Sequence, residues 1–182
     1  MRNSLKTILA LAVAIVLMLL IRATVVTIVS VEGEGLQPVF MAGDRVMVNR
    51  WSYGLRVGGN RFISYSRLWR DEVQRGDIVA VNDPQDTLQT DIAGRPVLLL
   101  CCRHLPGESV NLGDGNLQVP GRLTCADQDY YLMEPVGREG EGLLVIPEDH
   151  IIGRAFLIVY SHEPGQSLWD GWRTNRFFAY FQ

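Results

Sequence analysis

Few side chains in this sequence could act as a general base or as a nucleophile. The 182 residues include three cysteines and three histidines, and the 17 basic residues are 16 arginines and a single lysine, Lys6. Arginine stays protonated in proteins, so it cannot accept a proton from a reacting group. A mechanism that needs a neutral lysine amine would therefore depend on Lys6 alone.

The cysteines are Cys101, Cys102 and Cys125. In an oxidising compartment Cys125 could form a disulfide with one of the vicinal pair, which would leave an odd thiol. The alternative, which we favour, is that Cys101 and Cys102 are small buried residues of a strand. No histidine cluster accompanies the cysteines, so the sequence does not predict a zinc site, and we expect no cofactor.

The composition is that of a folded chain, with 47% hydrophobic and 20% charged residues and a formal net charge of −3. A module that binds duplex nucleic acid normally needs an excess of basic residues. Nucleic acid is therefore not an expected partner.

An uncharged apolar run of 14 residues, 8–21, follows Arg2 and Lys6 and ends at Arg22. A transmembrane helix needs about 20 residues, so a span over 5–24 requires Arg22 to reach the membrane interface. The alternative is a cleavable signal peptide, although no convincing cleavage site follows. We predict a cytoplasmic amino terminus at 1–4, a single transmembrane anchor at 5–24 in the cytoplasmic membrane, and an extracytoplasmic domain at 25–182.

The extracytoplasmic part has the pattern of strands separated by turns. Turn signals include Ala42-Gly-Asp44, Arg75-Gly-Asp77 and Leu105-Pro-Gly-Glu108. The apolar patterns between them predict strands at 45–49, 77–81, 97–102, 130–133, 142–146 and 151–160. One mainly β domain of about 150 residues fits this length.

The segment 169–182 is rich in aromatic residues: Trp169, Trp172, Phe177, Phe178, Tyr180 and Phe181. Aromatic residues at a membrane interface are one interpretation. We favour a terminal segment packed on the β domain, because Arg173 and Arg176 interrupt any amphipathic face.

Four segments carry a recognisable pattern in a fixed order. The first, Gly35-Leu-Gln-Pro-Val-Phe-Met-Ala-Gly-Asp-Arg-Val-Met-Val-Asn-Arg-Trp-Ser-Tyr-Gly54, is followed by Arg75-Gly-Asp-Ile-Val-Ala-Val-Asn-Asp-Pro84, by Leu98 to Glu108, and by Ile146 to Phe156. They resemble the Ser-Met-x-Pro, Arg-Gly-Asp-(Ile/Val)-Val, Lys-Arg-x-x-Gly-Leu-Pro-Gly-Asp and closing-strand boxes of the bacterial type I signal peptidase (leader peptidase) family. This resemblance implies a barrel- or sandwich-like β domain behind one transmembrane helix.

The resemblance also implies a serine endopeptidase that processes signal peptides. In the family a serine hydroxyl attacks the peptide bond, and a lysine amine whose pKa is depressed by burial serves as general base. Hydroxyl and backbone N–H donors beside the serine stabilise the oxyanion.

This chain departs from the family pattern at each catalytic position. Gly35 occupies the nucleophile position and Leu100 the general-base position. The segment 134–142 replaces a later family box and contains neither serine nor aspartate. Because glycine cannot attack a carbonyl and leucine cannot accept a proton, the chain is predicted to be a degenerate member.

Other residues offer little replacement chemistry. His104 lies four residues beyond the base position on a turn, and Cys102 is predicted to share a strand face with Leu100. Ser30 and Ser52 are displaced from the nucleophile position. The remaining histidines, His150 and His162, are expected to face solvent.

The substrate cleft of the family is apolar, and the resemblance assigns five positions to it: Val31, Leu36, Phe40, Leu98 and Leu99. A groove for an extended peptide is therefore one expectation, in which the peptide would add as a strand to a sheet edge. The alternative is that Phe40 and Leu100 plug the groove.

These observations lead to three hypotheses about function. The first is a catalytically inactive, membrane-anchored protein that binds signal peptides of exported preproteins or modulates an active paralogue. The second is an active signal-peptide-processing endopeptidase that uses non-standard residues. The third is a structural envelope component without peptide binding.

Overall fold

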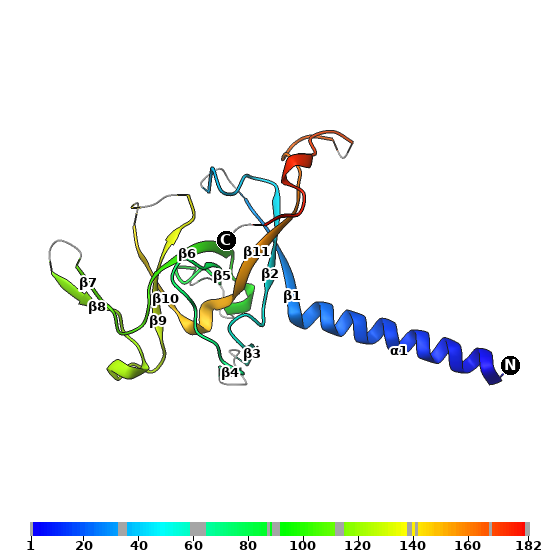
Figure 1. Cartoon of the computed structure of the whole chain (residues 1–182), viewed down its shortest axis with the longest axis horizontal. Coiled ribbons are helices and arrows are strands. Elements are labelled where there is room, and N and C mark those ends of the chain that lie inside the picture. Colours follow the sequence, from blue (N-terminus) through cyan, green and yellow to red (C-terminus); the bar gives the residue numbers. More distant parts are fainter. Residues whose placement is uncertain are drawn as a thin grey trace.

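The computed structural model describes residues 2–32, 36–58, 65–86, 88, 92–111, 115–137, 140, 142–167 and 169–180. Its one α-helix, α1 (Arg2–Val25), leads into a β domain. Figure 1 shows α1 extending away from the sheet, so that the amino terminus lies far from the β domain.

The apolar side chains of α1 between residues 8 and 19 are exposed. In the part of the chain that the structure describes, no helix is long and apolar enough to cross a membrane. The predicted transmembrane anchor over 5–24 is therefore not supported by the structure.

Eight strands form the main sheet, and all of its pairings are antiparallel. Their order is β1-β2-β11-β5-β6-β9-β10, with β12 paired to β11. The strands are β1 (Val26–Ser30), β2 (Asp44–Asn49), β5 (Ile78–Asn82), β6 (Val97–His104), β9 (Tyr130–Pro135), β10 (Leu144–Pro147), β11 (Ile151–Ser161) and β12 (Ala179–Tyr180).

Two short hairpins and four 3-10 turns complete the described structure. The hairpins pair β3 (Leu55–Val57) with β4 (Ser66–Leu68) and β7 (Ser109–Asn111) with β8 (Asn116–Gln118). The 3-10 turns are η1 (Ile92–Gly94), η2 (Arg122–Thr124), η3 (Glu148–His150) and η4 (Thr174–Arg176).

The prediction of a mainly β domain is confirmed, but the sheet is not a closed barrel. Within the described residues β1 pairs only with β2 and β10 pairs only with β9, so the two ends of the strand order do not join. The predicted strands correspond to β2, β5, β6, β9, β10 and β11. Strand β1 was not predicted, because the sequence pattern does not distinguish it from the apolar run that precedes it.

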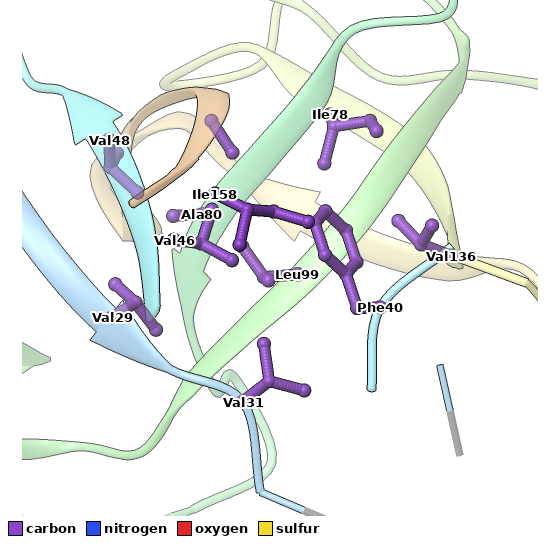
Figure 2. Close-up of a cluster of buried hydrophobic side chains, with 11 residues drawn as sticks. Val29, Val31, Phe40, Val46, Val48, Ile78, Ala80, Leu99, Val136 and Ile158 are labelled. Atoms are coloured by element: carbon purple, nitrogen blue, oxygen red, sulfur yellow. The ribbon is translucent and has the colours of Figure 1, made fainter. Parts of the chain in front are cut away.

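Two clusters of buried side chains form most of the core, and β6 contributes to both because successive side chains of a strand point to opposite faces. Leu99 packs in the first cluster, which also holds Phe40 and Ile158, as Figure 2 shows. Leu100 and Cys102 pack in the second cluster. A strand buried on both faces reads as a continuous apolar run, which is the pattern of residues 97–102.

All three cysteines are free thiols, so the disulfide considered from the sequence is absent from the structure. Cys102 is buried, Cys101 is half-buried and Cys125 is exposed. The alternative interpretation of the vicinal pair as strand residues is confirmed, because both lie in β6.

The aromatic C-terminal segment packs on the β domain through part of its length. The Trp172 ring lies 5.7 Å from that of Tyr160 and 6.0 Å from that of Phe177, measured between centroids. Strand β12 continues the contact with β11. Trp169 and Phe178 remain exposed.

Candidate functional site

A groove of about 830 Å³ lies between β1 and β6. Asn82 at the end of β5 and Ile152 in β11 also line it; these two strands, together with β2, lie between β1 and β6 in the sheet. Further lining residues come from these two strands, from the loops beside them, and from β3, β9 and β10: 27–32, Leu36, Arg50, Arg56, 96–100, Pro135 and Leu144.

Four of the five positions assigned to the cleft from the sequence line this groove: Val31, Leu36, Leu98 and Leu99. Phe40 does not line it, because its ring is fully buried in the first core cluster with Leu99 and Val136 (Figure 2). The alternative in which Phe40 plugs the groove therefore has no support in the structure. Whether the groove binds a peptide stays a prediction.

Leu100, which the sequence resemblance assigns to the general-base position, is 2% exposed. It packs in the second core cluster against apolar neighbours that include Val79 and Met133, and it also reaches the groove. The surroundings of this side chain suit an aliphatic group and would penalise a charge. Gly35, at the nucleophile position, lies outside the described residues.

The loop after Gly35 is held by buried polar contacts. Asp44 is fully buried, and its Oδ2 atom accepts hydrogen bonds from the backbone N–H of Met41 at 2.9 Å and from Nη2 of Arg176 at 2.7 Å. Arg176 also donates to the carbonyl oxygen of Val39 at 2.7 Å. A residue of the C-terminal segment thus fixes the loop that supplies Leu36 and Phe40.

The segment that replaces the later family box contacts the same loop. Gly137 adopts φ +82°, and a Cβ atom there would lie 2.6 Å from the carbonyl oxygen of Gln37 and 2.9 Å from that of Leu36. Only glycine permits this approach. Glu134, which is buried, forms an ion pair with Arg103. The segment therefore packs against the loop through its backbone.

Of the residues considered as replacements for the catalytic pair, Ser30 lines the groove and Ser52 does not, whereas Cys102 and His104 have other surroundings. Burial raises the pKa of the Cys102 thiol to about 12, with the charge of Cys101 as the next cause. The thiolate needed for nucleophilic attack is therefore scarce at neutral pH. His104 lies 3.5 Å from Glu108, which accepts hydrogen bonds from Arg75 at 2.8 Å.

The expectation that His150 and His162 face solvent is wrong for His150, which is 8% exposed. Its Nδ1 atom lies 2.9 Å from Asp149 and its Nε2 atom 3.1 Å from Nη1 of Arg95. With Nδ1 protonated, the ring donates to Asp149 and accepts from Arg95. His162 is half-buried, and its ring packs at 5.0 Å on Trp172. Neither histidine is among the residues that line the groove.

The polar groove residues that were not assigned to the cleft from the sequence are Thr27, Ser30, Glu32, Arg50, Arg56 and Asn82. Arg50 follows β2, Arg56 lies in β3, and Asn82 ends β5, so only the tertiary structure brings them together. In the sequence the two arginines lie next to apolar strand patterns, and these positions do not indicate that the two side chains share a site.

Among the described residues, no group of three or more histidine, cysteine or carboxylate side chains could hold a metal ion. The acidic residues of the domain instead pair with arginines, as Glu148 does with Arg67, Arg70 and Arg122 at 3.7, 3.0 and 3.3 Å.

Comparison with known protein families gives one match. The family model described as "Signal peptidase, peptidase S26" matches residues 4–142. This range includes α1 except its first two residues, the loop after Gly35, and both groove-forming strands, β1 and β6. No curated protein matches the chain.

Proposed function

The chain belongs to the signal peptidase family, peptidase S26, and we propose that it is a member without peptidase activity that binds extended peptide segments of exported proteins. The groove between β1 and β6 is the proposed binding site. The observation that carries the proposal is the free edge of β1 along this groove.

Within the described residues β1 has a strand partner on one side only, β2. Residues Thr27 to Ser30 of β1 line the groove, as does Val31 directly after the strand. An extended peptide in the groove can pair with the backbone of this edge and place alternate side chains against Leu36 and Leu98. Such binding needs no catalytic residue.

The loss of peptidase activity is supported by the residues at the family's catalytic positions. The chain has glycine at position 35 and a buried leucine at position 100. Its single lysine, Lys6, lies in α1, outside the β domain. The raised pKa of Cys102 argues against a thiol replacement.

A cleavage and crosslinking experiment tests this function. The full chain, purified in detergent, is incubated with a preprotein that an active family member cleaves, and products are analysed by mass spectrometry. A photoreactive residue is then placed at Leu36, in the groove, or at Leu117, an exposed residue of β8 that serves as control. We expect no cleavage and crosslinking to the signal segment from position 36 only.

Two results would contradict the proposal. Cleavage at the signal junction would show an active endopeptidase with non-standard residues. Absence of crosslinking from Leu36 at saturating preprotein would favour a structural envelope component. Slower cleavage by an active paralogue when this chain is added would instead extend the proposal to modulation of that enzyme.

The proposal includes an extracytoplasmic location of residues 25–182 at the cytoplasmic membrane, where exported chains emerge. Cys125 offers a probe, because its thiol is exposed. A membrane-impermeant maleimide should label Cys125 in intact spheroplasts, and a Cys125→Ser variant should lose that label. Labelling only after lysis would place the domain in the cytoplasm.

A further inference from the structure

The groove has a basic end, formed by Arg50 and Arg56 where β1 and β6 begin. Arg50 donates its backbone N–H to the carbonyl oxygen of Val25 at 2.8 Å, next to the start of β1. Asn82 pairs with Val97 at the start of β6, and both line the groove with the two arginines.

Arg56 carries its charge in a half-buried position. Burial lowers the pKa of this guanidinium, the charges of Arg67 and Arg50 lower it further, and Tyr65 and Asp149 act in the opposite direction. Lowering of an arginine pKa means that its environment disfavours the positive charge. Arginine nevertheless stays protonated at neutral pH, so a cation persists at this end of the groove.

The charged groups around Arg56 are occupied by other partners. Asp149 accepts a hydrogen bond from His150 at 2.9 Å. Arg67 pairs with Glu148 at 3.7 Å and donates to the carbonyl oxygen of Ile151 at 2.6 Å. Within the described residues Arg56 has no ion pair, although it lines an open groove. Arg56 is therefore available to an anion that enters the groove.

The opposite end of the groove has the opposite sign. Glu32, which is exposed, lines the groove just after Val31. From Thr27 to Glu32 the extended chain covers about 17 Å at roughly 3.3 Å per residue. A peptide of about six residues would thus reach from the carboxylate of Glu32 to the basic end, past the apolar wall formed by Leu36 and Leu98.

We infer that the basic end of the groove binds a carboxylate of the peptide, and that Arg56, assisted by Arg50, gives the groove a preference for acidic peptides. This inference rests on the proposed function. The guanidinium offers several N–H donors in a geometry that matches a carboxylate. The carboxylate is supplied either by an acidic side chain or by a free C-terminus.

Fluorescence anisotropy with five labelled eight-residue peptides tests the inference. The peptides share an alanine–leucine core. One peptide is neutral with blocked termini, and one carries a lysine. The other three carry a carboxylate: one has an N-terminal aspartate, one has a C-terminal aspartate with an amidated end, and one has a free C-terminus. The full chain is compared with Arg56→Gln and with Arg45→Gln, a matched control at an exposed arginine of β2 outside this groove.

We expect at least one carboxylate peptide to bind about tenfold more tightly than the neutral peptide, the effect of one charge-assisted hydrogen bond. The peptide that gains affinity identifies the source of the carboxylate and its orientation. Arg56→Gln should remove this preference, so that the carboxylate peptides bind no more tightly than the neutral one, whereas Arg45→Gln should keep it. The lysine peptide should bind the unmodified chain less tightly than the neutral one.

The outcomes separate the inference from the function on which it rests. Equal affinity of the unmodified chain for all five peptides would overturn the charge preference while leaving peptide binding in place. Failure of every peptide to bind would reject both. The lysine peptide tests the charge effect on the unmodified chain, so the answer does not depend on the folding of Arg56→Gln.

Discussion

Position 100 illustrates how one side chain can determine what a site does. In the family pattern this position holds a lysine that must be neutral to accept a proton, and burial favours the neutral amine. In this chain Leu100 fills the position, 2% exposed, and packs with Val79, Val81 and Met133. The same buried environment that would depress the pKa of an amine stabilises the leucine by apolar contact.

Restoring the two family residues should not restore the enzyme. The Gly35→Ser, Leu100→Lys variant is expected to show no cleavage of a preprotein, because 134–142 also lacks the serine and aspartate of the later family box. Chemical denaturation should show a loss of about 3 kcal/mol, the order expected for a buried group without a partner.

Leu100→Met is the matched control for this variant and should cost less than about 1.5 kcal/mol, since volume and polarity are retained. Turnover by the double variant would show that the residual site is closer to an active one than its residues indicate.

At the scale of elements, the C-terminal segment forms hydrogen bonds with the loop after Gly35, which contributes to the groove. Arg176, in η4, contacts Asp44 and Val39, and Arg173 donates to the carbonyl oxygen of Ala42 at 2.9 Å. These contacts join residues more than 130 positions apart. The family match ends at residue 142, so this support comes from outside the matched region.

Arg176→Ala should therefore destabilise the domain. Asp44 is fully buried, and removal of its cation would leave an unpaired buried charge, which costs about 3–5 kcal/mol. Urea denaturation followed by circular dichroism measures the change.

Arg45→Ala, at an exposed arginine next to Asp44, serves as control and should stay within about 0.5 kcal/mol of the unmodified chain. Adding Asp44→Asn to Arg176→Ala should recover part of the loss, because an amide oxygen can still accept the hydrogen bond from Met41. Equal effects at positions 45 and 176 would contradict the assigned role.

Across the whole molecule, stability depends on acidic groups that are charged in the folded state. Burial opposes the charge of Asp149 and would raise its pKa. The hydrogen bond and the charge of His150 lower it, as do a hydrogen bond from Gln128 and the charge of Arg56. These favourable effects prevail, so the pKa of Asp149 lies below its usual value.

The pH dependence follows from the direction of this shift. A carboxyl group whose pKa is lower in the folded than in the unfolded state contributes stability above its unfolded pKa, about 3.9, and loses it as pH falls through the folded value. The free energy of unfolding should therefore decrease below about pH 4.

Asp149→Asn should flatten this decrease and lower stability at pH 7. The control is Asp71→Asn, at an exposed carboxylate, which should leave the acid limb unchanged. Urea denaturation at pH 7, 4 and 3 makes the comparison, and identical pH profiles for Asp149→Asn and the unmodified chain would contradict the assignment.

The sequence by itself predicted six of the eight strands of the main sheet, and the expectation that the family's catalytic residues are missing rests on the sequence alone. Alternating or continuous apolar patterns mark β2, β5, β6, β9 and β11, because burial on one or both faces constrains each residue locally. The apolar stretch before residue 31 does not distinguish helix from strand, since both α1 and β1 use such residues. Periodicity alone therefore missed the strand that borders the groove.

The tertiary structure decided the features that depend on distant pairing. It left the sheet open, buried Phe40 and His150, and placed Arg50 and Arg56 on one groove with Asn82. It also joined Arg176 to Asp44. The physical reason is that these contacts arise from strand order and loop packing, and neither is encoded in the spacing of the residues that meet.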